Sequence, residues 1–228
     1  GGGGYVRPSS NPVPYYTPTK VGTTTPLVTT AQTADSSALF SENLSGSGQE
    51  LIIAGRATPN GSTYSSYNLS VFGWANGTLV NKTTQWFSGT DNQIMGTEPS
   101  IKFADFNNDG RLDMYVAPNS DTNVYGPGII FLNNGTSFTR TNLSLGNIAG
   151  HDSAVYDMNR DGIADIVQLS YNGNISFILG SASNNFSTYT NTSSIRGGAG
   201  IAAGDFLANG SSSLIVTDSY DSASGKYL

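Results

Sequence analysis

Short runs of apolar and β-branched residues alternate with polar turns along most of the chain. Runs such as residues 51–54 (Leu-Ile-Ile-Ala) and 214–217 (Leu-Ile-Val-Thr) have the length and composition of β-strands. Asn-Gly pairs at residues 76–77, 134–135 and 172–173 each lie between two such runs. Asn-Gly favours a type I′ hairpin turn, because both residues tolerate positive φ. No long segment shows an apolar 3.6-residue period, so the pattern predicts an all-β fold with little helix.

The N-terminal segment, residues 1–33, lacks this pattern. Four glycines precede a stretch rich in Pro, Thr and Ser, a composition typical of a flexible tether. One interpretation is a lipid anchor on a cysteine just upstream of Gly1, because mature bacterial lipoproteins often begin with a glycine run. An artificial or protease-trimmed end is another. A third hypothesis makes residues 21–28 a strand that closes a ring or adds to a neighbour's sheet edge.

Two copies of one acidic loop occur at residues 105–113 and 157–165. Each has oxygen-bearing side chains at loop positions 1, 3, 5 and 9 and a glycine at position 6. A hard cation such as calcium takes six to eight oxygen ligands, and alternate residues of a tight loop point inward. The sequence therefore predicts two Ca²⁺ sites. The predicted ligands are Asp105, Asn107, Asp109, Asp113 and the Arg111 carbonyl in the first, and Asp157, Asn159, Asp161, Asp165 and the Ile163 carbonyl in the second.

These loops begin like an EF-hand loop but continue differently. An EF-hand needs a bidentate glutamate at position 12 and a helix on each side. Position 12 is Val116 in the first copy and Gln168 in the second, and each loop leads directly into a β-rich segment. We therefore expect the loops to connect strands.

Two degenerate copies extend the repeat. In the copy at residues 205–213, Leu207 replaces the position-3 ligand, and a serine replaces the position-9 carboxylate. The copy that begins at Asn43 is one residue shorter. Loss of half the side-chain ligands favours structural turns over metal sites. The oxygens that remain in the copy at residues 205–213, a weak candidate site, belong to Asp205, Asn209 and Ser213. The four copies start 62, 52 and 48 residues apart, a spacing that suits propeller blades.

An acidic loop repeated between strands resembles the FG-GAP or VCBS repeat, the blade unit of integrin-α-type β-propellers. The resemblance implies three to four four-stranded antiparallel blades within residues 34–228, as part of a larger seven-bladed ring. The implied units lie near residues 38–98, 99–150, 151–199 and 200–228. Because the last unit is short, we expect either a longer natural chain or neighbouring copies that pair with the open blade edges.

Composition indicates an exported protein. Charged residues make up only 11% and the net charge is −6, which disfavours nucleic-acid binding. There are no cysteines, and no apolar stretch approaches the ~20 residues of a membrane span. The chain contains eleven Asn-x-Ser/Thr sequons, about twice the chance expectation. These candidate N-glycosylation sites are Asn43, Asn60, Asn68, Asn76, Asn81, Asn134, Asn142, Asn174, Asn185, Asn191 and Asn209. An alternative is that Asn-Gly-Ser/Thr simply suits hairpin turns.

Nothing in the sequence identifies catalytic groups, so we expect no enzyme. The single histidine, His151, adjoins Asp152, but no zinc pattern, P-loop or dinucleotide fingerprint is present. The sequence favours an extracellular, calcium-binding cell-surface protein for adhesion or filament assembly, with a protein or glycan partner or further copies of itself. Alternatives are a propeller accessory to a secreted hydrolase and a lectin-like propeller. The aromatic residues that would stack on sugars in a lectin are Trp74, Trp86, Tyr125, Tyr171 and Tyr189.

Overall fold

The computed structural model describes residues 36–48, 50–56, 66–95, 99–117, 127–143, 150–170, 173–191 and 198–218. The chain divides into two compact units, Gly1–Ala31 and Gln32–Leu228, and every described residue belongs to the second. The predicted tether at residues 1–33, the hypothetical strand at residues 21–28 and the sequon at Asn60 lie outside the described residues.

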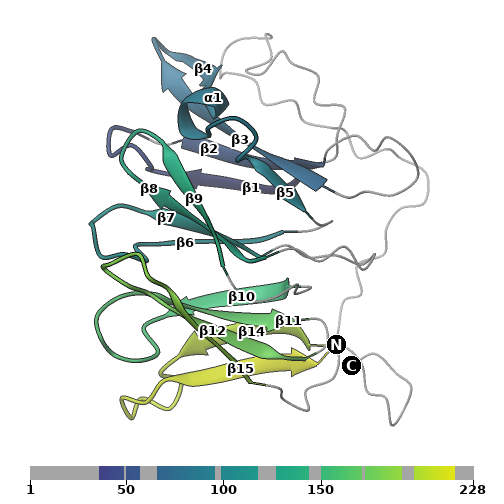
Figure 1. Cartoon of the computed structure of the whole chain (residues 1–228), viewed down its shortest axis with the longest axis vertical. Coiled ribbons are helices and arrows are strands. Elements are labelled where there is room, and N and C mark those ends of the chain that lie inside the picture. Colours follow the sequence, from purple (N-terminus) through teal and green to yellow (C-terminus); the bar gives the residue numbers. More distant parts are fainter. Residues whose placement is uncertain are drawn as a thin grey trace, which may run out of the picture. The chain divides into compact units, whose positions relative to one another are not determined.

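The described residues form successive antiparallel sheets in chain order, with a single short helix among them (Figure 1). The second sheet contains β6 (Ser100–Ala104), β7 (Asp113–Ala117), β8 (Ile129–Asn133) and β9 (Phe138–Asn142). The third contains β10 (Gly150–Tyr156), β11 (Asp165–Ser170), β12 (Ile175–Leu179) and β13 (Ser187–Asn191). The last contains β14 (Gly198–Gly204) and β15 (Ser213–Asp218). This nearly all-β structure confirms the predicted blades, which form no closed ring within the described residues.

The first sheet differs because its outer strand is split. It contains β1 (Ser36–Glu42), β2 (Glu50–Arg56), β3 (Ser66–Ala75), β4 (Thr78–Asn81) and β5 (Gln93–Met95). Both β4 and β5 pair with β3, and the helix α1 (Thr83–Trp86) lies between them in the chain. This insertion accounts for the longest repeat spacing in the sequence, the 62 residues from Asn43 to Asp105.

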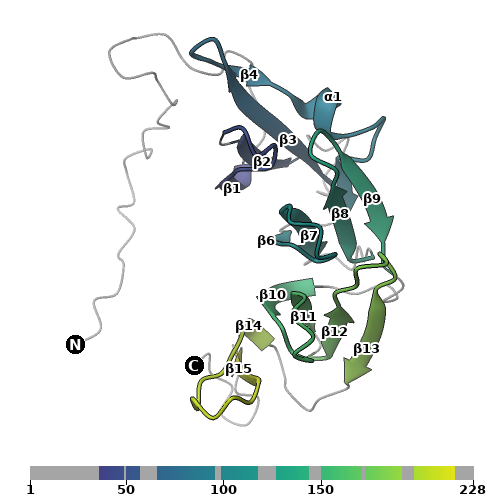
Figure 2. The same ribbon diagram turned by 90° about the vertical axis from the view of Figure 1, so that its left-hand side faces the viewer.

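Apolar clusters join each sheet to the next. One cluster joins the first and second sheets and includes Trp86 and Phe87 from the end of α1, which pack on Phe138 of β9. Two further clusters join the second sheet to the third and the third to the last. Among the second, third and last sheets, strand contacts between neighbours involve the first two strands of each sheet. The fourth strands β9 and β13 lie on the outer side in Figure 2.

The predicted hairpins all form, and the first has the predicted turn. Asn76 and Gly77 connect β3 to β4 with φ of 51° and 76°, as a type I′ turn requires. The prediction of a type I′ turn was wrong at residues 134–135, because Gly135 has a positive φ of 93° but Asn134 does not have a positive φ. The predicted turn at residues 172–173 includes residue 172, which lies outside the described residues, but the strands on either side of it pair as expected.

Candidate metal-binding loops

Each acidic loop connects the first two strands of its sheet, and the connections lie at one end of the sheets, on the left in Figure 1. The loop at residues 105–113 leads from β6 into β7, and the loop at 157–165 leads from β10 into β11. The degenerate loops occupy the same place between β14 and β15 and between β1 and β2. The expectation that the loops connect strands is therefore confirmed.

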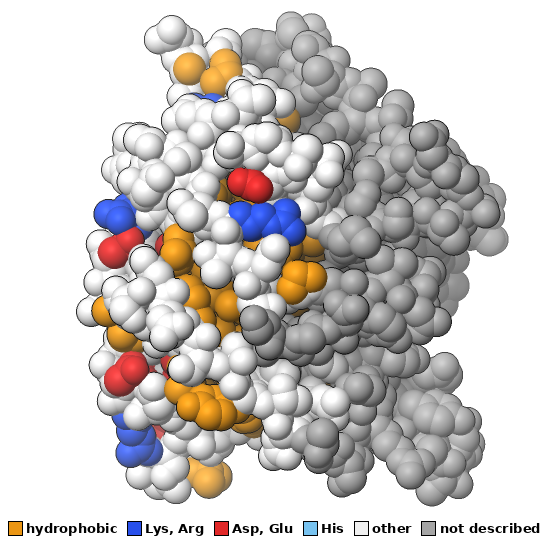
Figure 3. Space-filling model, in the orientation of Figure 1, with side chains coloured by type: hydrophobic (Ala, Val, Ile, Leu, Met, Phe, Trp, Pro, Cys, Tyr) orange, Lys and Arg blue, Asp and Glu red, His pale blue; other side chains and the backbone are white. Residues whose placement is uncertain are grey.

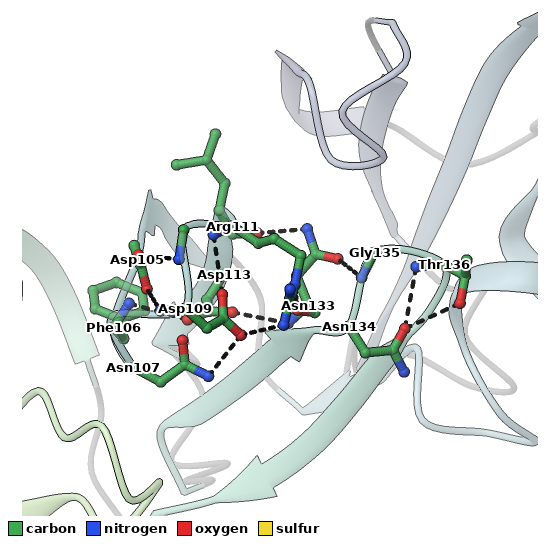
Figure 4. Close-up of polar contacts among 12 residues, drawn as sticks. Asp105, Phe106, Asn107, Asp109, Arg111, Asp113, Asn133, Asn134, Gly135 and Thr136 are labelled. Atoms are coloured by element: carbon green, nitrogen blue, oxygen red, sulfur yellow. Dashed lines mark hydrogen bonds and ion pairs between the residues drawn. The ribbon is translucent and has the colours of Figure 1, made fainter.

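The position-1 carboxylate organises the first complete loop (Figure 4). Asp105 Oδ1 accepts a hydrogen bond from the backbone N–H of Asp109 at 3.0 Å, and its Oδ2 accepts one from Gly110 at 2.7 Å. Asp109 Oδ1 in turn accepts the N–H of Arg111 at 3.0 Å. The glycine at position 6 has φ of 83°, a left-handed conformation that a Cβ would disfavour. The acidic side chains thus lie on the inner side of a tight loop.

The position-9 carboxylate is buried at the start of the second strand. Asp113 has no solvent exposure, and it accepts hydrogen bonds from the backbone N–H groups of Phe106 at 3.0 Å and Asn133 at 2.8 Å. Burial raises the pKa of Asp113 to about 6, against the opposing effect of these two hydrogen bonds, and the nearby Asp109 and Asp105 carboxylates add to the rise. A cation in the loop would relieve this crowding of negative charge.

The position-3 amide supplies an unpaired buried oxygen. Asn107 is 9% exposed, and its Nδ2 donates to Asp109 Oδ2 at 3.0 Å. Its Oδ1 is buried and has no hydrogen-bond partner among the described residues. Buried polar atoms are almost always paired, so an unpaired oxygen among carboxylates is the kind of atom that a bound cation would satisfy.

The second complete loop repeats this geometry. Asp157 accepts hydrogen bonds from Asp161 N at 3.1 Å and Gly162 N at 2.9 Å, and Asn159 Nδ2 donates to Asp161 Oδ2 at 2.9 Å. Asp165 is fully buried and accepts backbone hydrogen bonds from the loop and from Gly180 at the end of β12. Burial raises the pKa of Asp165 as well. This loop differs from the first in its amide oxygen, because Asn159 Oδ1 accepts the Asp161 N–H at 3.0 Å.

The degenerate loop at residues 205–213 keeps the turn but not the ligand set. Asp205 accepts hydrogen bonds from Asn209 N at 3.1 Å and Gly210 N at 2.7 Å, as its counterparts do. Position 3 is Leu207, which is 71% exposed, and Ser213 begins β15 without a carboxylate. This turn therefore keeps the hydrogen bonds of the complete loops but only part of their oxygen ligands.

The degenerate loop at residues 43–50 contains a carboxylate that the sequence reasoning missed. Glu50, at position 8, is 2% exposed and accepts the Leu44 N–H at 3.0 Å, as Asp113 accepts that of Phe106. Lys82 Nζ lies 3.8 Å from Glu50 Oε1. The side chain of Lys82 passes over Gly73 on its way to Glu50. A Cβ added at Gly73 would lie 2.6 Å from Lys82 Nζ. An ammonium group thus pairs with the buried carboxylate of this loop.

Arg111 and Asn133 make further contacts with side chains or carbonyls of the first complete loop. Arg111 Nη2 lies 2.5 Å from Asp109 Oδ2, and its Nε donates to Asn133 O at 2.7 Å, so a cation would compete with this guanidinium. Asn133, which was not predicted from the sequence, is 1% exposed. Its Nδ2 donates to Leu112 O at 2.9 Å and to Leu44 O at 2.8 Å, and thereby joins this loop to the one in the preceding sheet.

The aromatic residues considered for sugar stacking do not form one set. Trp86 has no exposure because it packs against Phe138, so the hypothesis that it stacks on a sugar was wrong. Trp74 and Tyr189 are 49% and 59% exposed, on β3 and β13 of different sheets. Tyr125 and Tyr171 lie outside the described residues.

The loop oxygens are the chemically suitable feature for a metal ion. The described residues contain no group of three His, Cys, Asp or Glu side chains already placed to hold one. In the complete loops, Asp105 and Asp157 accept hydrogen bonds from N–H groups of their own loops. Each complete loop nevertheless combines three carboxylates with one amide, all oxygen donors, which suits a hard divalent cation. The predicted carbonyl ligands belong to Arg111 and Ile163, which lie in the same loops.

The chain matches the family model described as the FG-GAP-like repeat, at residues 46–116 and 105–168. The matches together span residues 46–168, more than half of the 228 residues, and include both complete loops, β6, β7, β10 and the first part of β11. No curated protein matches the chain significantly. The sequence match and the repeated strand–loop–strand geometry agree, and the chain belongs to the FG-GAP-like repeat family.

Proposed function

We propose that this chain is an extracellular, calcium-binding surface module that serves adhesion or assembly and has no catalytic role. Repeats of this family are typical of extracellular proteins. Its partner is a protein or glycan at the cell surface, or further copies of the chain. Within the described residues, no helix has the length and apolar character needed to cross a membrane.

The observation that carries the calcium proposal is the buried, unpaired Asn107 Oδ1, in a loop that also contains the mutually repelling carboxylates of Asp105, Asp109 and Asp113. A loop that bound no cation would not need four oxygen-bearing side chains. The second loop supports the proposal because it repeats the same side chains in the next sheet. Calcium, when bound, supplies positive charge that offsets the repulsion between these carboxylates.

Different carboxylates hold different parts of each loop in place. Asp105 and Asp157 fix the turn through backbone N–H groups, and the buried Asp113 and Asp165 tie it to the third strand of the sheet or to the residue after that strand. An ion held by such a loop would stiffen the connection between the first two strands. Rigid blades present a stable surface to a partner, as adhesion or assembly requires.

Thermal unfolding with and without calcium tests the proposal. An ion bound only by the folded state adds about 2.7 kcal/mol at a free concentration of 100 times its Kd. Each kcal/mol shifts the Tm of a chain of this size by roughly 2–4 °C. Two ions should therefore raise Tm by about 10–20 °C over the chelated protein. Magnesium is the control, because its smaller octahedral shell fits these loops less well. Equal Tm values in calcium and chelator would contradict the proposal.

A further inference from the structure

Sequon asparagines recur at the same two places in three successive sheets. The turn before the outer strand contains Asn76 in the first sheet, Asn134 in the second and Asn185 in the third. The last residues of the outer strands β4, β9 and β13 are Asn81, Asn142 and Asn191. In the first sheet, β4 is the first half of the split outer strand. We call these six residues the edge sequons.

The edge sequons are all exposed to solvent. Asn68, another sequon asparagine, contrasts with them. It lies within β3, which pairs with β2 on one side and β5 on the other, and it is only partly exposed. A preference for hairpin turns explains an asparagine at Asn76 or Asn134, but it does not explain the recurrence at the ends of outer strands.

The outer strands are where a bulky attachment would fit and would serve a purpose. β9 and β13 each stand at an edge of their sheet, and both lie on the outer side in Figure 2. In β13 four of five residues are exposed. An exposed edge strand can pair with the edge of another sheet, so proteins commonly protect it. The face in Figure 3 shows few charged side chains, which leaves little charge to do this.

The folded backbone holds two edge sequons in an Asx turn. Asn134 Oδ1 accepts hydrogen bonds from Thr136 N and Thr136 Oγ1, both at 3.1 Å. Asn81 Oδ1 accepts the Thr83 N–H at 2.8 Å. In both, the backbone N–H of the third sequon residue donates to the asparagine side chain; Thr136 is exposed, and Thr83, the first residue of α1, is partly exposed.

We propose that the edge sequons carry N-linked glycans that cover the outer strand edges of the sheets. The co-reactant is an oligosaccharide on a polyprenyl phosphate or diphosphate carrier, used by an oligosaccharyltransferase. The asparagine Nδ2 forms a bond to the sugar C1 as the C1–O bond to the carrier phosphate breaks. The displaced amide proton and the freed phosphate oxygen leave with the lipid carrier. This inference is independent of calcium binding.

Glycopeptide mass spectrometry of the protein isolated from the cells that produce it tests the modification. We expect glycan mass on at least four of the six edge sequons, with all three sheets represented, and none on Asn68. Glycans on fewer than four, a sheet without any, or a glycan on Asn68 would overturn the proposal.

A matched pair of variants tests the attachment chemistry at Asn134 in a secreting host with an oligosaccharyltransferase. Thr136→Ser keeps the sequon and Thr136→Ala removes it, and Thr136 is exposed, so neither change should alter Tm. The glycan at Asn134 should persist in the first variant and disappear in the second. Its persistence in Thr136→Ala, or its absence from both, would overturn the assignment.

The covering role has its own test. The triple variant Asn81→Gln, Asn142→Gln and Asn191→Gln should form larger species by light scattering at the same concentration, because it exposes outer strand edges. Asn68→Gln is the control and should remain like the unsubstituted protein. A triple variant as monodisperse as this control would refute the covering role.

Discussion

At the scale of single residues, the buried carboxylates Asp113 and Asp165 have a different role from the exposed part of their loops. Each accepts backbone N–H groups from the loop and from the third strand or the residue after it. These donors are partly or fully buried and would lose their partners if the carboxylate were removed. The position-5 carboxylates Asp109 and Asp161 accept mainly from their own loops.

Substitution at these two positions should therefore give different results. Asp109→Ala should lower Tm in calcium but change it little in chelator, because it removes mainly an ion ligand. Asp113→Ala should destabilise the protein by about 2–5 kcal/mol in both conditions, since it leaves buried N–H groups unpaired. Thermal unfolding of both variants, with and without calcium, provides the comparison. Equal losses in chelator would contradict the separation of roles.

Arg111 is expected to weaken ion binding at the first loop. Its guanidinium lies against Asp109 Oδ2, and a cation must displace it. Arg111→Gln should strengthen calcium binding at this loop about two- to fivefold, the value of a largely exposed ion pair. Arg160→Gln is the matched control, because Arg160 is a loop arginine that forms no ion pair within the described part of the chain. Calorimetric affinities that do not change in Arg111→Gln would show that the contact is irrelevant to binding.

At the scale of elements, the loop between β1 and β2 has one buried glutamate and a lysine where the complete loops have a cluster of aspartates. Glu50 accepts loop hydrogen bonds and pairs with Lys82, which follows β4. Glu50→Ala should destabilise the protein by about 2–4 kcal/mol, because it unpairs a buried N–H and an ammonium group. The loss should be equal in calcium and in chelator by thermal unfolding. A loss seen only in calcium would mean that this loop also binds the ion.

The elements that the sequence predicted are those with a local signal. The loops at residues 105–113 and 157–165 show their spacing directly, and Asn76-Gly77 forms the turn that its dipeptide favours. The role of Glu50 could not be predicted from the loop spacing. Its side chain is longer than that of aspartate, so from position 8 it reaches the place that an aspartate reaches from position 9. The helix α1 was missed because a four-residue helix has no periodicity, and only tertiary packing places Trp86 in the core.

At the scale of the whole described unit, Asp152 links three sheets through one carboxylate. It lies on β10, its Oδ1 is 3.5 Å from Lys102 Nζ on β6, and its Oδ2 accepts the Ile201 N–H of β14 at 3.1 Å. Ser100 of β6 also donates to Oδ1, at 3.3 Å. This residue therefore helps to set how successive sheets align.

Removal of this carboxylate should weaken the contacts between sheets. Asp152→Ala should cost about 1–2 kcal/mol, mainly from the unpaired Ile201 N–H. Lys102→Met removes only a partly exposed ion pair and should cost less than about 1 kcal/mol. Urea denaturation of both variants measures the difference. A larger loss in Lys102→Met than in Asp152→Ala would contradict this account.

Calcium stoichiometry, measured by isothermal titration calorimetry, tests the central claim most directly. The account predicts two ions for the unsubstituted chain and one for each of Asp109→Ala and Asp161→Ala, because each variant loses a ligand in a different loop. Both variants should remain folded by circular dichroism. Absence of calcium binding to the unsubstituted chain, or two ions retained in both variants, would contradict the assignment of the two loops as metal sites.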